Sequence, residues 1–143
     1  KISKNCAVAW FEVGFVKMNV LIVESKRHLA ELWRRSLERL GAHVDIAPSQ
    51  DHAADMVAIE SYDIVVLDLI LEEGSAFAVA DFMNYRQPEA RVIFVTNTSF
   101  FSDGSIFQLF SNACAYVQSE TAPDDLAAII EHYATKNHNA PRL

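Results

Sequence analysis

Short apolar runs alternate along the chain with segments of helical periodicity, starting at Met18. This alternation is typical of a parallel sheet whose two faces are covered by helices. Two of the runs, IVVLD and VIFVT, are continuous enough to be central strands. The pattern predicts five strands, Val20–Val23, His43–Ala47, Ile64–Asp68, Arg91–Thr96 and Ala115–Gln118.

Helices are expected after each strand, which gives an α/β fold with a doubly wound sheet, (βα)5. Ser49 can cap the second helix with its hydroxyl. The fourth contains Gly104 and three serines and should be the least stable. Ile59 and Phe77 are among the apolar positions expected to face inward. The predicted helical ranges are 26–40, 49–60, 76–86, 102–112 and 123–135.

The same pattern divides the chain into an N-terminal extension, residues 1–17, a domain, residues 18–135, and a tail or linker stub, residues 136–143. Met18 is a natural start for the domain. The extension holds one apolar run, AVAWFEVGFV, whose ten residues are too short to span a bilayer. No small-residue cleavage site follows it. We therefore expect neither a membrane span nor secretion.

Charge and cysteine usage narrow the function classes. The net charge is −7, and residues 18–143 hold nine basic and 18 acidic residues, so the domain should repel nucleic acid. Cys6 and Cys114 match no metal or redox spacing, which favours a reduced, cytoplasmic setting. The five histidines fall singly on different elements and predict no zinc site.

Candidate chemistry gathers where the strands end, because ligands of open parallel sheets bind outside the carboxyl ends of the strands. A pair of carboxylates there can hold Mg²⁺, and one of them can attack phosphorus to form an acyl phosphate. A plain alternative is that Asp68 merely ends its strand and caps the following loop. The strand-end residues are Glu24, Ser25, Asp68, Thr96, Ser119 and Glu120.

Four segments, MNVLIVES, IVVLDLILEEGSAFAV, VIFVTN and NACAYVQSE, resemble in order the signatures of response regulator receiver domains of two-component signalling. The resemblance covers about residues 18–135 and implies a flavodoxin-like fold with strand order 2-1-3-4-5. It implies that Asp68 is the phosphoacceptor, Thr96 the switch hydroxyl and Tyr116 the switch aromatic residue. Glu24, Asp68 and the backbone carbonyl of Ile70 would then hold Mg²⁺.

The departures from the family pattern also lie at this edge. Ser25 replaces the second acidic residue, which weakens the expected Mg²⁺ site, and Ser119 and Glu120 replace a lysine and the proline after it. In the loop after Asp68, Glu72 replaces a proline and Ala76 a common glycine. Each change at the metal and lysine positions opposes phosphorylation.

Two functions remain open on these residues. The first is a phosphorylation switch, not an enzyme beyond autophosphatase activity, which accepts a phosphoryl group from a histidine kinase or phosphotransfer protein. The second is a pseudo-receiver, an interaction module that works without phosphate. In either case a downstream partner or a second copy is expected on the face of the fourth helix, fifth strand and fifth helix. A nucleotide binder is a third possibility, opposed by the loop ESKRH, which lacks glycine.

Overall fold

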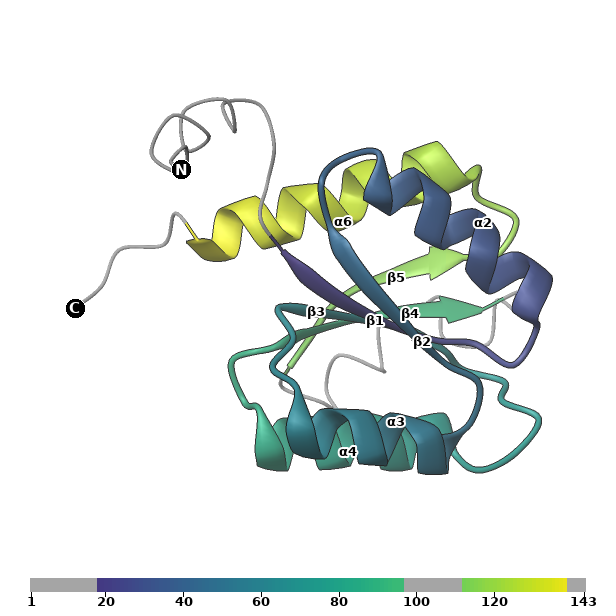
Figure 1. Ribbon diagram of the computed structural model, residues 1–143, viewed down its shortest axis with the longest axis vertical. Coiled ribbons are helices and arrows are strands. Elements are labelled where there is room, and N and C mark those ends of the chain that lie inside the picture. The colour runs from purple at the N-terminus through teal and green to yellow at the C-terminus, as the bar shows by residue number, and fades with distance from the viewer. Residues whose placement is uncertain (1–17, 97–111, 139–143) are drawn as a thin grey trace, which may run out of the picture.

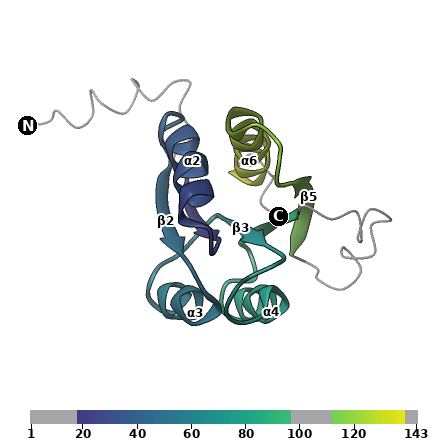
Figure 2. The same cartoon turned by 90° about the vertical axis from the view of Figure 1, so that its right-hand side faces the viewer.

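The computed structural model describes residues 18–96 and 112–138, and within these it contains one parallel sheet between two pairs of helices (Figures 1 and 2). The strand order is β2-β1-β3-β4-β5, as the resemblance predicts. The strands are β1 (Asn19–Val23), β2 (His43–Ala47), β3 (Ile64–Asp68), β4 (Arg91–Thr96) and β5 (Ala113–Gln118).

Each face of the sheet is covered by two helices. Figure 2 shows α2 and α6 on one side and α3 and α4 on the other. The described helices are α2 (Arg27–Glu38), α3 (Gln50–Ile59), α4 (Ala76–Arg86) and α6 (Pro123–His138). The helix expected over 102–112 lies outside the described residues except for Asn112, which lies in a turn before β5.

Two cores follow from the alternation of side chains along the strands. In β1, Val20 and Ile22 pack toward α2 and α6, whereas Leu21 and Val23 pack toward α3 and α4. β3 is buried on both faces, as a continuous apolar run predicts for a central parallel strand. The sheet is thus fixed on both sides, which holds the carboxyl ends of the strands in place.

The helix ends agree closely with the sequence pattern. The Ser49 hydroxyl accepts the N–H of His52 and caps α3, as predicted, and Ser75 caps α4 in the same way through Ala78. Two inward positions were wrong, because Ile59 is 79% exposed and Phe77 37% exposed. Within the described ranges no helix is long and apolar enough to cross a membrane.

Candidate functional site

The first two site residues, Glu24 and Asp68, lie on adjacent strands at the same edge. Val23 pairs with Leu67 in the parallel register, so the next residue of each chain segment, Glu24 and Asp68, comes one step further along. Both are buried, with 1% and 7% of their surfaces exposed. The predicted pair of carboxylates is therefore present, and both members are largely removed from water.

This burial creates an electrostatic conflict. Burial, and next the adjacent Asp68 carboxylate, raise the pKa of Glu24 to about 8, while the backbone N–H of Lys26, donating to Oε2 at 3.0 Å, opposes the rise. The other oxygen, Oε1, is buried and has no hydrogen-bond partner among the described residues. Two ionised carboxylates cannot donate to each other, so the pair needs a proton or a cation.

The orientation of Asp68 is fixed by the turn that follows it. Its Oδ1 accepts the N–H of Ile70 at 2.9 Å, and the N–H of Leu69 donates to the carbonyl of Val95 on β4 at 2.9 Å. Asp68 therefore also caps the next loop, which was the plain alternative for this residue. The Ile70 side chain is 61% exposed beside the pair.

Ser25, which replaces an acidic residue, joins three loops of the edge. Its hydroxyl donates to the carbonyl of Pro48 at 3.0 Å and accepts the N–H of Glu72 at 2.9 Å. These bonds connect the segments that follow β1, β2 and β3. The sequence alone did not indicate this role, because the two partners lie 23 and 47 residues away.

The predicted switch residues occupy neighbouring strands. Thr96 is fully buried at the end of β4, one residue beyond Val95, which pairs with Asp68. Tyr116 of β5 pairs with Phe94 of β4 and is partly exposed. It lies two residues before the end of its strand. Thr96 thus lies at the edge with Asp68, whereas Tyr116 lies further back along the sheet.

The residues at the lysine and proline positions do not join the carboxylate pair through any described hydrogen bond. The N–H of Ser119 donates to the carbonyl of Thr96 at 2.9 Å, and Glu120 is exposed in the turn after β5. Glu72 is also exposed, and its backbone N–H donates to the Ser25 hydroxyl. These two glutamates therefore face solvent.

Gln50, the first residue of α3, also supports the loop after Asp68, and sequence reasoning missed it. Its N–H donates to the carbonyl of Glu73 at 3.3 Å, and its Oε1 accepts the N–H of Ser75 at 2.8 Å. Gly74 between them has a positive φ of 93° and leaves no room for a side chain against Gln50. A glycine in this loop was the available signal for a close approach.

The residues at this edge fit a hard cation in part. Glu24, Asp68 and the carbonyl of Ile70 supply oxygen, and the partnerless Oε1 of Glu24 is an available ligand atom. The Ser25 hydroxyl is engaged by Pro48 and Glu72. Among the described residues no group of three or more His, Cys, Asp or Glu side chains forms a metal cluster. A cation here would therefore have two carboxylates and one backbone carbonyl from the protein, with water completing its shell.

Comparison with known proteins agrees with this geometry. Residues 20–131 match the model of the response regulator receiver domain family. The chain is 29% identical over 113 residues to the transcriptional regulatory protein DltR of Streptococcus agalactiae, which covers 79% of this chain. It spans only 50% of that protein's length.

Solved structures share the fold. The CheY-like receiver domain protein of Methanospirillum hungatei superposes with a TM-score of 0.77 at 21% identity, covering 86% of this chain and 98% of that one. TrrA of Thermotoga maritima, solved with Mg²⁺ and BeF, gives 0.71 at 22% identity and covers 81% and 98%. With a family match over most of its length, the chain belongs to the response regulator receiver domain family of two-component signalling.

Proposed function

We propose that this domain accepts a phosphoryl group on Asp68. The observation that carries the proposal is the buried Glu24 and Asp68 pair at the carboxyl edge, with one glutamate oxygen free of hydrogen bonds among the described residues. An oxygen of Asp68 attacks phosphorus, the new O–P bond forms as the N–P bond of a phosphohistidine breaks, and the imidazole leaves. The donor is a histidine kinase or phosphotransfer protein.

The chain's own residues orient this reaction. The N–H of Ile70 holds one oxygen of Asp68, and the bond from Leu69 to Val95 fixes the turn. Glu24, Asp68 and the Ile70 carbonyl would hold Mg²⁺, which, when bound, neutralises negative charge on the phosphoryl oxygens. Thr96, buried at the end of the next strand, is the hydroxyl proposed to bond the transferred group, and Tyr116 the aromatic residue that responds.

A second candidate function, a pseudo-receiver that binds partners without phosphate, is favoured by Ser25. Its hydroxyl joins the loops after β1, β2 and β3. A proton shared by Glu24 and Asp68 would also relieve the repulsion between the two carboxylates, so that the edge needs no cation. The names of the streptococcal relatives indicate that those proteins regulate transcription. We propose the same output for a longer protein that would contain this domain. The acidic domain itself is a poor ligand for DNA.

A phosphorylation assay in solution distinguishes the two proposed functions. We expect the wild-type chain, incubated with acetyl phosphate and Mg²⁺, to gain one phosphoryl mass by intact mass spectrometry. Addition of EDTA should prevent the gain, because charge neutralisation by the metal is lost. If the mass is unchanged even at high Mg²⁺, the phosphoacceptor proposal is wrong and the pseudo-receiver is favoured.

A change at Ser25 tests the metal site. Ser25→Asp should tighten Mg²⁺ binding by about tenfold, because it adds a carboxylate beside Glu24 and Asp68. The affinity can be measured by NMR titration of the amides of Glu24, Asp68 and Leu69. Ser25→Asn is the matched control, with the same shape and no charge. Equal affinities of the two variants would show that position 25 does not reach the cation.

A further inference from the structure

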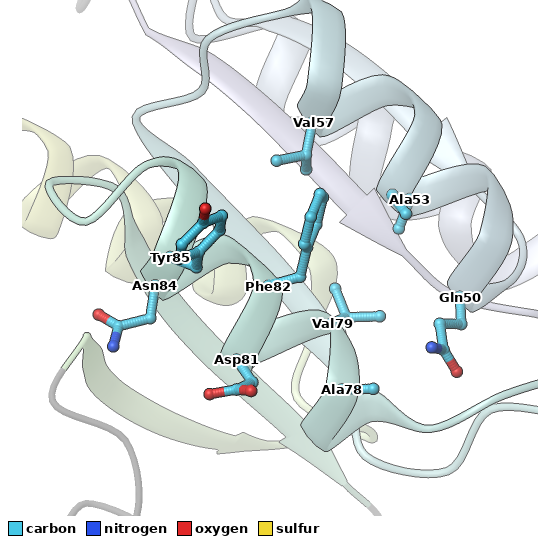
Figure 3. Close-up of a pocket in the computed structure, with 10 residues that line it drawn as sticks. Gln50, Ala53, Val57, Ala78, Val79, Asp81, Phe82, Asn84 and Tyr85 are labelled. Atoms are coloured by element: carbon cyan, nitrogen blue, oxygen red, sulfur yellow. The ribbon is translucent and has the colours of Figure 1, made fainter.

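The outer surface of α3 and α4 carries a groove whose lining does not include the carboxylate pair. It has a volume of about 640 Å³. Figure 3 shows the Phe82 ring of α4 standing between the two helices, near Val57 of α3 and Val79 of α4. The groove is lined by Gln50, Ala53, Ala54, Val57, Ala78, Val79, Asp81, Phe82, Asn84 and Tyr85.

The groove results from the small side chains that line the two helices. Ala53, Ala54 and Ala78 carry only methyl groups and leave space between the helices unfilled. Larger apolar groups remain at its margins, where Tyr85 is 80% exposed and Phe82 is partly exposed. Ile59, expected inward, is exposed at the end of α3. Both helices thus present apolar surface outward as well as inward, which is unusual for helices that cover only one face.

The charge on the two helices is mostly negative. Together α3 and α4 carry three Asp residues, a single Arg and no Lys. That arginine, Arg86, donates to the carbonyl of Ala58 at 3.0 Å and so ties α4 to α3. Asp51, Asp55 and Asp81 are exposed on the two helices. An occupant would therefore combine apolar side chains with positive charge.

Among the described helices of a second copy, the basic α2 is a poor occupant. It would supply the positive charge, but its exposed side chains are all polar or charged and offer no apolar group to fill the groove. Such a contact would also join two different surfaces, which does not close into a dimer. The exposed positions from Lys26 to Arg39 are Lys26, Arg27, His28, Arg35, Glu38 and Arg39.

We propose that the groove between α3 and α4 binds a basic amphipathic helix of a partner protein. Its apolar residues would lie on Phe82, Ala54 and Ala78, which are partly exposed, and its Lys or Arg residues would face Asp55 and Asp81. The ten-residue α3 is about 15 Å long, enough for roughly three turns of a bound helix. Gln50 lines the groove and also holds the loop after Asp68, so this surface adjoins the phosphoacceptor site.

The test uses two designed helical peptides of about 14 residues, each with leucine at positions i, i+3, i+4 and i+7. One carries Lys and Arg on its flanks, and the other carries Glu at the same places. We expect the basic peptide alone to shift the NMR signals of Ala54, Phe82 and Tyr85. Its affinity should fall about tenfold in the double variant Asp55→Lys, Asp81→Lys, and also as salt is raised.

Matched controls keep the result interpretable. The double variant Glu38→Lys, Asp125→Lys makes the same charge change on the exposed surfaces of α2 and α6, across the sheet, and should leave the affinity unchanged. Tyr85→Ala removes an exposed ring without disturbing the core and should also weaken binding. The proposal is overturned if both peptides bind equally, if the shifts fall elsewhere, or if sedimentation shows a dimer that Asp55→Lys, Asp81→Lys abolishes.

Discussion

Asp68→Asn will leave the chain without a phosphoryl adduct under conditions in which the wild type is modified. The amide oxygen of asparagine can still accept the N–H of Ile70, so the turn is kept while the nucleophilic carboxylate is lost. Intact mass spectrometry after incubation with acetyl phosphate and Mg²⁺ measures the result. We expect complete loss, because Asp68 is the proposed nucleophile, whereas Glu24, the other buried carboxylate at the edge, is proposed to hold the metal.

The control for this change is Asp81→Ala, which removes an exposed aspartate on α4 and should be phosphorylated like the wild type. Thermal unfolding provides a second control. Asp68→Asn should not lower Tm, because it removes the carboxylate that helps to raise the pKa of Glu24 and replaces it with a neutral donor. A phosphoryl adduct on the asparagine variant would place the acceptor at another residue.

Much of this edge was predictable because it depends on strand ends. β2, β3 and β4 have the predicted bounds. For β3 and β4 the reason is that a nearly continuous apolar run is buried on both faces of the sheet. Once the parallel order is known, Glu24 and Asp68 must be neighbours. Their roles as metal ligand and phosphoacceptor stay predictions, as do those of Thr96, Tyr116 and the Ile70 carbonyl.

The contacts between loops were not predictable in the same way. In the sequence, Ser25 indicates only that a metal ligand of the family is missing. In the structure its hydroxyl forms hydrogen bonds with two loops that are distant in sequence. Ile59 and Phe77 read as inward because they are apolar, but local periodicity does not say how many apolar faces a helix has. In both cases the outcome depends on which elements meet in space, and a single segment carries no information about that.

Gly74→Ala will lower the free energy of unfolding by about 3 kcal/mol, which corresponds to a fall in Tm of roughly 10 °C. The φ of 93° at this position is unfavourable for any residue with a Cβ, and the added methyl group would overlap the Cβ of Gln50. Moving Gln50 would weaken its bonds to Glu73 and Ser75. Thermal and urea denaturation measure the loss.

Gly41 is the matched control, because its φ is 92°, nearly the same as that of Gly74. It lies in the turn after α2, where its N–H donates to the carbonyl of Glu38 and that of Ala42 donates to the carbonyl of Leu37. Gly41→Ala should cost only about 1 kcal/mol, the strain of the backbone alone. If both substitutions cost the same, contact with Gln50 contributes nothing. A larger loss at Gly74 would show that α3 holds the loop after Asp68 in place.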